Sequence, residues 1–382
     1  MSKRSAEPLE KDIQLKKPRT TDNHSPDCQD PDCEGCDIGE VEISFIRKND
    51  QGEEENVSVQ PTGQELLTMA KEEQGDTDMS RRLFDMALEQ FEKEEQGKTG
   101  EGYAQCLVEL GRALNVKESI QEGYDIFIGK ESSKFVQLWQ ARAALALAQS
   151  IRQQKNKTFE ELRLDLEDTD GEIEDEVALE KLIMKDQVSK EEIKYYKEAL
   201  GNLDKILSQP FDNLDEQTLL LARQTMHDIR EYGETLEQPN HEEHVAVLFD
   251  TLIRYIQHFP YENDDNLLTL WGASLLHRQK FVQGKEKEMI CQRAEKLIQQ
   301  AKNTYVSKYN QESPLGWELY AMLKMTQSNM AEDEDQILEL YDESIQAFKK
   351  ALELNPGNEK LQEMLELLGS TGEEEDDDVE EQ

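Results

Sequence analysis

From Thr62 onward, apolar residues follow the 3.6-residue period of an α-helix almost to the end of the chain. In DTDMSRRLFDMALEQFEKEEQ, apolar side chains recur at steps of three and four residues, and HVAVLFDTLIRYIQHFP repeats the pattern later in the chain. The breaks between such segments contain Pro210, Pro239, Pro260, Pro314 and Pro356. Proline lacks the N–H that a helix interior needs, so helices end there. The pattern predicts an all-α body of about fourteen helices over residues 62–369.

One C-terminal segment indicates how these helices pack. The stretch YDESIQAFKKALELNPGNEKL carries Tyr341, Ser344, Phe348, Ala351 and Pro356 at the positions that tetratricopeptide (TPR) repeats use for the second helix of a pair and its exit. The small residues let neighbouring helices approach, Phe348 fills the groove between them, and Pro356 ends the helix.

Earlier pairs of a large and a small residue, Leu110–Gly111 and Trp271–Gly272, show the same signature. Their separations do not follow the constant period of about 34 residues that a regular TPR array would have. We therefore predict a TPR-like α-solenoid of degenerate antiparallel helix pairs. A non-repeating helical bundle is the alternative.

Segments of a different composition flank or interrupt the helical body. Residues 1–38 are rich in Pro, Asp, Ser and Lys and predict a disordered basic arm, and residues 370–382 predict an acidic disordered tail. Residues 39–61 alternate apolar and polar side chains around a turn and predict a small β-hairpin. The acidic stretch DLEDTDGEIEDEVALE, residues 165–180, predicts a solvated linker near 165–176.

The charge balance excludes several functions. The chain has 84 Asp and Glu against 43 Lys and Arg, and its formal net charge is -41. Such a surface repels phosphates, so direct nucleic-acid binding is not expected, whereas basic proteins are natural partners. The most apolar run, AALALA, is far too short to cross a bilayer. The short apolar run predicts a soluble intracellular protein. The five cysteines, an odd number, fit a reducing compartment, where no disulfide framework is needed.

The first nineteen residues contrast with this acidity, since they carry six positive charges. The clusters Lys3-Arg4 and Lys16-Lys17-Pro18-Arg19 are separated by residues 5–15, a spacing that lets one extended segment fill two acidic pockets of a nuclear-import adaptor. We therefore predict a bipartite import signal formed by Lys3, Arg4, Lys16, Lys17 and Arg19, and a nuclear protein. A merely solvated tail is the alternative.

The segment HSPDCQDPDCEGCDIG contains the only metal-like constellation, His24, Cys28, Cys33 and Cys36. Cys33-x-x-Cys36 has the spacing of a tetrahedral zinc knuckle, but a second Cys pair is missing. A structural zinc, a redox-sensitive thiol pair and an inert cysteine cluster therefore all stay open. No other cofactor is expected.

Catalytic motifs are not found in the sequence: it has no phosphate-binding glycine loop and no nucleophile elbow. His241 and His244 lack the spacing of a metalloprotease, and we expect them, with His258 and His277, to be surface or partly buried helix residues. Buried packing positions are expected for Cys106, Cys291, Trp139, Trp271 and Trp317. The sequence predicts a protein that is not an enzyme.

The C-terminal pair GWELYAMLKMTQSNMAEDEDQILELYDESIQAFKKALELNPGN combines a Trp-led helix, an acidic insertion and a Tyr-started helix. With the basic N-terminus and the acidic helical body, it resembles the fungal nuclear family named for enhancing translation termination, also known as a negative regulator of a 2-oxoglutarate prolyl hydroxylase. The resemblance covers roughly residues 62–369, and it carries over no catalytic or partner-binding residue.

This resemblance implies a nuclear, non-enzymatic adaptor that binds and regulates an iron and 2-oxoglutarate oxygenase, linked to translation termination or oxygen-responsive regulation. The alternative is an acidic nuclear chaperone for histones or ribosomal proteins, whose acidic segments would shield a basic client.

Overall fold

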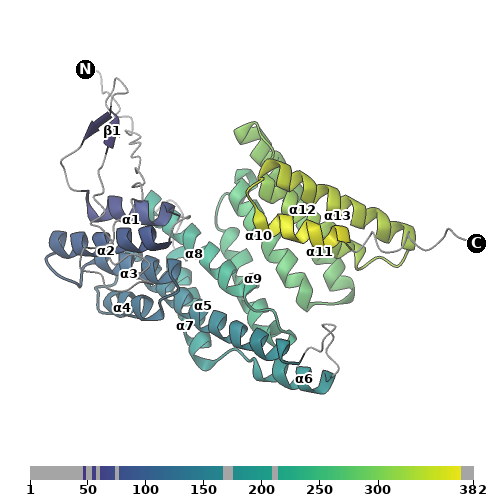
Figure 1. The fold of residues 1–382 in the computed structure, drawn as a ribbon, viewed down its shortest axis with the longest axis horizontal. Helices are drawn as coiled ribbons and strands as arrows, with labels where there is room; N and C mark the ends of the chain where they lie inside the picture. The colour runs from purple at the N-terminus through teal and green to yellow at the C-terminus, as the bar shows by residue number, and fades with distance from the viewer. Residues whose placement is uncertain are drawn as a thin grey trace, which may run out of the picture.

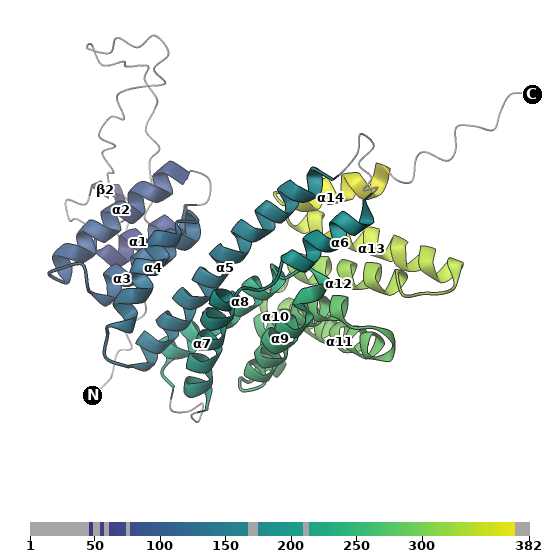
Figure 2. The same cartoon turned by 90° about the horizontal axis from the view of Figure 1, so that it is seen from below.

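A computed structural model describes residues 46–48, 54–56, 61–73, 77–166, 175–208 and 214–370. Apart from a short hairpin, this part of the chain is an extended row of packed helices, with α1–α4 at one end and α10–α13 at the other (Figures 1 and 2). The α-helices are α1 (Gly63–Glu72), α2 (Thr77–Glu94), α3 (Glu101–Ala113), α4 (Lys117–Ile128), α5 (Lys134–Leu164), α6 (Glu176–Lys185), α7 (Lys190–Leu207), α8 (Glu216–Glu234), α9 (Glu242–Ile256), α10 (Asp265–Arg278), α11 (Gly284–Tyr309), α12 (Pro314–Ser328), α13 (Glu334–Leu354) and α14 (Glu359–Ser370). Short 3-10 helices η2 (Pro239–His241), η3 (Tyr261–Asn263) and η4 (Gln279–Phe281) lie between them. The predicted all-α solenoid is confirmed.

The predicted hairpin is present as two short antiparallel strands, β1 (Ile46–Lys48) and β2 (Glu54–Asn56). Ile46 lies opposite Asn56 in the register. The alternating residues that suggested the hairpin, 41–45 and 57–59, lie outside the described residues.

Local side chains determine where several helices begin. The Thr62 hydroxyl accepts a hydrogen bond from the Glu65 N–H (3.2 Å), and the Glu65 carboxylate accepts one from the Thr62 N–H (3.0 Å). Ser189 and Glu192 repeat this reciprocal arrangement at the start of α7. Each capping box satisfies N–H groups that the first turn of a helix leaves without partners.

The last residues of the acidic stretch, 176–180, belong to α6. The Asp175 carboxylate accepts a hydrogen bond from the Ala178 N–H (2.9 Å), and Glu176 lies in the first turn. Negative charge at this end of a helix also interacts favourably with the helix dipole. Acidic side chains therefore start a helix here instead of only solvating the chain.

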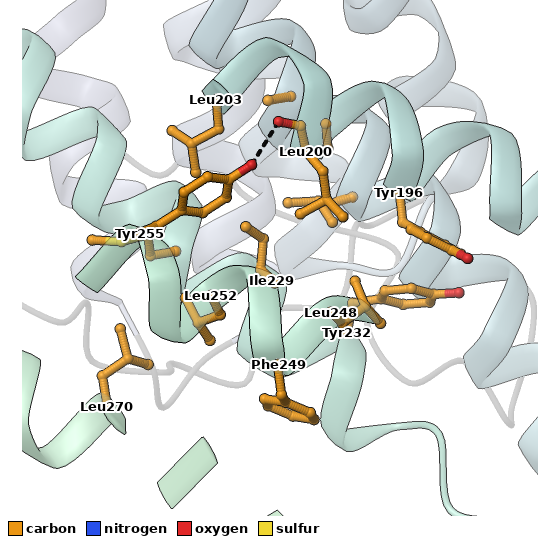
Figure 3. Close-up of a cluster of buried hydrophobic side chains, with 14 of the residues drawn as sticks. Tyr196, Leu200, Leu203, Ile229, Tyr232, Leu248, Phe249, Leu252, Tyr255 and Leu270 are labelled. Atoms are coloured by element: carbon orange, nitrogen blue, oxygen red, sulfur yellow. Dashed lines mark hydrogen bonds between the residues drawn. The ribbon is translucent and has the colours of Figure 1, made fainter. Parts of the chain in front are cut away.

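Buried side chains from α3 through α12 form one continuous core, part of which is shown in Figure 3. The Tyr255 hydroxyl donates to the backbone oxygen of Leu200 (2.8 Å), so this buried phenol is satisfied within the core. Smaller clusters join α1–α3 at one end and α12–α14 at the other. No described helix has both the length and the apolar character needed to cross a bilayer.

The small residues identified in the sequence lie where helices approach closely. A Cβ on Gly111 would lie 2.4 Å from a side-chain carbon of Ile120 in α4, and one on Gly272 would lie 2.8 Å from Ile298 in α11. Ser344 and Ala351 are buried between α12 and α13. The predicted role of these small side chains in helix pairing is thus confirmed, although α5 packs mainly on α7 and not on its sequence neighbour α6.

Candidate functional site

A charged groove lies where α1 and α3 meet α5 and α8. It has a volume of about 500 Å³. Its charged lining includes Lys71 from α1, Glu109 and Arg112 from α3, Arg142 from α5 and Asp228 from α8. We call this set the charged groove.

The charges of the groove form a continuous network. Asp228 accepts from Arg112 Nη2 (2.6 Å) at one carboxylate oxygen and from Arg142 Nε (2.7 Å) at the other. Arg142 Nη1 also donates to Glu109 (3.1 Å), and Glu109 pairs with Lys71 (3.3 Å). The network therefore joins helices that are more than a hundred residues apart in the sequence, since Arg112 and Asp228 are 116 residues apart.

Both carboxylates of the network are held ionised. Burial alone would raise the pKa of Asp228, but Arg142 and Arg112 outweigh it and the pKa lies below its ordinary value. Burial likewise opposes ionisation of Glu109, but Arg142 and then Lys71 lower its pKa. Despite its burial, the pKa of Arg112 is raised by Asp228 and Glu109. These groups are fixed charges across the physiological pH range.

One polar atom of the groove lining, and another on a residue packed beside it, have no partner among the described residues. The Arg142 guanidinium stacks on the Trp139 ring, 4.7 Å from its centroid. The buried Nε1 of Trp139 and Nη1 of Arg112 have no hydrogen-bond acceptor in the described part of the chain. Because Arg112 lines the groove, its Nη1 is placed to donate to a carbonyl or carboxylate of a partner.

We expect Asp228→Asn to lower the free energy of unfolding by about 3 kcal/mol, because it leaves two largely buried guanidinium groups without their shared anion. Chemical denaturation followed by circular dichroism measures the change. The control is Glu231→Gln, whose side chain is 49% exposed, and we expect it to cost under about 1 kcal/mol. Equal effects of the two substitutions would show that the network does not stabilise the fold.

A second buried ionic cluster lies farther along α5. Arg152 is fully buried and donates to Asp186 (2.6 Å), Glu192 (2.8 Å) and the backbone oxygen of Gln187 (3.2 Å). Lys155 pairs with the second oxygen of Glu192 (3.1 Å). We call Arg152, Lys155, Asp186 and Glu192 the Arg152 cluster; it joins α5 to the start of α7.

His241 of η2 completes this cluster as a neutral imidazole. Its Nδ1 accepts from the Gln238 N–H (3.3 Å), so Nε2 carries the proton and donates to the backbone oxygen of Asp186 (2.5 Å). Burial, together with the nearby Arg152 charge, lowers the pKa of His241. Both ring nitrogens are therefore used within the fold.

The structure confirms some sequence expectations for individual residues and corrects others. Cys106, Cys291, Trp139 and Trp271 are buried in the core and Trp317 is partly buried, as predicted. His258 is exposed and His244 is half-buried, also as expected. The prediction was wrong for two histidines. His241 and His277 are buried, because backbone carbonyls of Asp186 and Leu236 satisfy their ring nitrogens.

The predicted import signal and the predicted metal ligands lie outside the described residues. These are Lys3, Arg4, Lys16, Lys17 and Arg19, and His24, Cys28, Cys33 and Cys36. Within the described ranges, no group of three or more His, Cys, Asp or Glu side chains is arranged to hold a metal ion.

The charged groove and the Arg152 cluster were not predicted from the sequence. One signal was present: Arg142 lies directly before the most apolar run of the chain, AALALA, and Arg152 lies four residues after it. An arginine in a buried helix needs a carboxylate partner, so its presence indicates a buried ion pair. The partner itself cannot be read from this segment.

The fold and the groove define an all-α helical-repeat protein with a network of paired charges between its helices. No family model matches the chain, and no curated protein matches it. Among solved structures, the chain is similar to the hypoxic regulator of sterol synthesis Nro1, described as a nuclear import adaptor. The identity is 13%, the TM-score is 0.42, and the alignment covers 79% of this chain and 91% of that chain.

A second structure, of the S. pombe nuclear import adaptor Nro1 in space group P21, gives 12% identity and a TM-score of 0.41, over 80% of this chain and all of the other.

Proposed function

We propose that the protein is a nuclear, non-enzymatic adaptor that binds and regulates a 2-oxoglutarate and Fe(II) prolyl hydroxylase, in translation termination or oxygen-responsive regulation. The observation that carries the adaptor role is the helical array from α1 to α14, in which small residues pack inside and long polar side chains face outward. Such arrays bind partners by contacts distributed over several helices.

The electrostatics of the charged groove favour recognition over chemistry. A general acid or base needs a pKa near the working pH, and burial usually raises the pKa of a catalytic carboxylate. Here the pKa values of Glu109 and Asp228 are lowered by arginines instead. Fixed, mutually paired charges suit a surface that orients a partner.

The choice of an oxygenase as the partner is supported by the resemblance of the C-terminal helix pair to the family described above. The nuclear location is supported by the two basic clusters at Lys3-Arg4 and Lys16-Lys17. An import adaptor is accordingly a second proposed partner.

A chaperone for histones or ribosomal proteins is the competing function, and the net charge of -41 favours it. The acidic residues 373–381 would then contribute strongly to binding, because basic clients are held by charge. The two functions therefore predict different salt dependence.

The test is affinity purification of the tagged full-length protein, followed by binding measurements with the purified partner. We expect a 2-oxoglutarate oxygenase in stoichiometric amount, with an affinity that changes less than about threefold when residues 373–381 are deleted. Raising the salt concentration should weaken the complex only modestly, since packed side chains contribute to it. A complex that forms only with histones or ribosomal proteins, and only with the acidic tail present, would overturn the oxygenase proposal.

A further inference from the structure

One face of α12 exposes two apolar side chains on either side of a carboxylate. Leu315 is 43% exposed and Met322 is 40% exposed. Glu318 lies between them, and the spacing of three and four residues places all three on the same side of the helix. We call Leu315, Glu318 and Met322 the α12 strip.

The α12 strip borders a cavity of about 380 Å³ between α10, α12 and the junction of α13 and α14. Leu315 and Glu318 line it from α12. Polar side chains on the other walls are Asn266 and Thr269 from α10, and Asn355 and Asn358 from the α13–α14 junction. The cavity therefore combines apolar edges with amide groups and carboxylates.

Glu318 has no cation to balance it at short range. Its side chain is partly buried, and it makes no hydrogen bond or ion pair with any described residue. Burial raises the pKa of Glu318, and only the charge of Arg230 opposes this. Arg230 is itself bonded to Glu234 (2.8 Å). The cavity's other carboxylate, Asp265, is paired with Lys308 (3.0 Å).

Two amide side chains of the cavity can also form hydrogen bonds with a partner. Asn266 and Asn355 make no side-chain hydrogen bond within the described residues, whereas the Asn358 oxygen accepts from the Leu361 N–H (3.2 Å). A primary amide offers both a donor and an acceptor, so it can pair with the N–H and C=O of an extended peptide. The cavity thus has groups suited to a backbone as well as to a cation.

We propose that this cavity binds an extended segment of a partner protein that carries a lysine or arginine close to apolar side chains. The cation pairs with Glu318, the apolar side chains cover Leu315 and Met322, and Asn266 and Asn355 hold the backbone. The inference rests on the proposed adaptor function, and charge complementarity selects this occupant: a partly buried carboxylate without a paired cation is costly until a cation reaches it.

The geometry also gives the length of the segment. Leu315 and Met322 are seven residues apart on a helix, which is about 10 Å at a rise of 1.5 Å per residue. About three residues of extended chain span this distance. Because side chains of an extended chain alternate between two faces, the register that turns all three toward the α12 strip places the apolar residues four apart with the basic residue midway, a span of about 13 Å.

The test is selection of random seven-residue peptides displayed on phage, against the immobilised full-length protein. We expect the selected peptides to carry Lys or Arg between apolar residues. The affinity of a selected peptide, measured by fluorescence anisotropy at low salt, should fall about tenfold or more in Glu318→Gln, because a charge-assisted hydrogen bond is lost. Selection against Glu318→Arg should instead return peptides with Asp or Glu.

The matched control is Glu339→Gln, which removes an exposed carboxylate of α13 that does not line the cavity. It should leave the peptide affinity unchanged. Glu318→Gln should also have a thermal midpoint no lower than that of the wild type, since the unpaired carboxylate does not stabilise the unbound fold. Selection that returns no peptide, peptides without a basic residue, or equal affinities for Glu318→Gln and the wild type would overturn the inference.

The two proposals fail in different ways. If the oxygenase binds the full-length protein and Glu318→Gln does not weaken the peptide complex, the cavity inference fails and the adaptor proposal stands. If basic peptides depend on Glu318 and no oxygenase binds, the cavity stands and its natural partner is a different basic protein.

Discussion

Replacing Arg152 by methionine should lower the free energy of unfolding by about 3–5 kcal/mol, the cost of breaking a buried ion pair by removing one partner. Asp186 and Glu192 would lose the guanidinium that balances them, while both remain buried. Methionine keeps much of the side-chain volume, so the loss reports charge and hydrogen bonding more than a cavity. Urea denaturation followed by circular dichroism measures it.

Two variants test the cause of this loss. Arg254→Met removes a cation that is 57% exposed, and we expect it to cost under about 1 kcal/mol. Adding Asp186→Asn and Glu192→Gln to Arg152→Met should recover part of the stability, because no uncompensated charge then remains buried. If Arg152→Met costs no more than Arg254→Met, the cluster contributes nothing to stability.

The free energy of unfolding should fall as the pH falls, because of two groups of the Arg152 cluster. Burial opposes ionisation of Glu192, but hydrogen bonds from Ser189 and the charge of Arg152 lower its pKa below the ordinary value of 4.5. Its contribution is therefore complete above pH 4.5 and is lost as the pH falls. The pKa of His241 is lowered from 6.5, so the unfolded state binds more protons there and stability declines as the pH falls below 6.5. The difference between wild type and Arg152→Met should accordingly shrink in acid.

The second large effect concerns the N-terminal arm. Changing Lys3, Arg4, Lys16 and Lys17 to alanine together should move the protein from nucleus to cytoplasm, because two-pocket recognition needs both basic clusters. Fluorescence microscopy of a tagged protein at native expression measures the ratio of nuclear to cytoplasmic signal. We expect that ratio to fall severalfold.

Lys11→Ala provides the control, since it removes a positive charge from the same arm but outside both clusters. It should leave the protein nuclear. The import hypothesis is wrong if the quadruple variant remains nuclear as well, and solvation would then be the role of these charges.

Local features of the sequence were sufficient to predict the helical part of the fold. Thr62 begins α1 and Ser189 begins α7 through side chains three residues away, so their effect depends on neighbouring residues alone. The same is true of the 3.6-residue apolar period and of small residues such as Gly272 at helix contacts. These are short-range properties, and the sequence displays them directly.

The candidate sites depend on residues that meet only in three dimensions. Arg142 and Asp228 are 86 residues apart, and Arg152 and Glu192 are 40 apart. The sequence contains many carboxylates, and nothing in the order of residues says which one reaches a given arginine.

The sequence by itself therefore determined the helices, their caps, the small residues at their contacts and the presence of arginines in an apolar helix. Only the tertiary structure decided that Asp228 bridges two arginines, that His241 is buried and neutral, and that Glu318 borders a cavity without a nearby cation. The physical reason is that caps and periodicity act within one or two helical turns. Charge pairing and burial depend instead on distances between helices, which are set when the whole array packs.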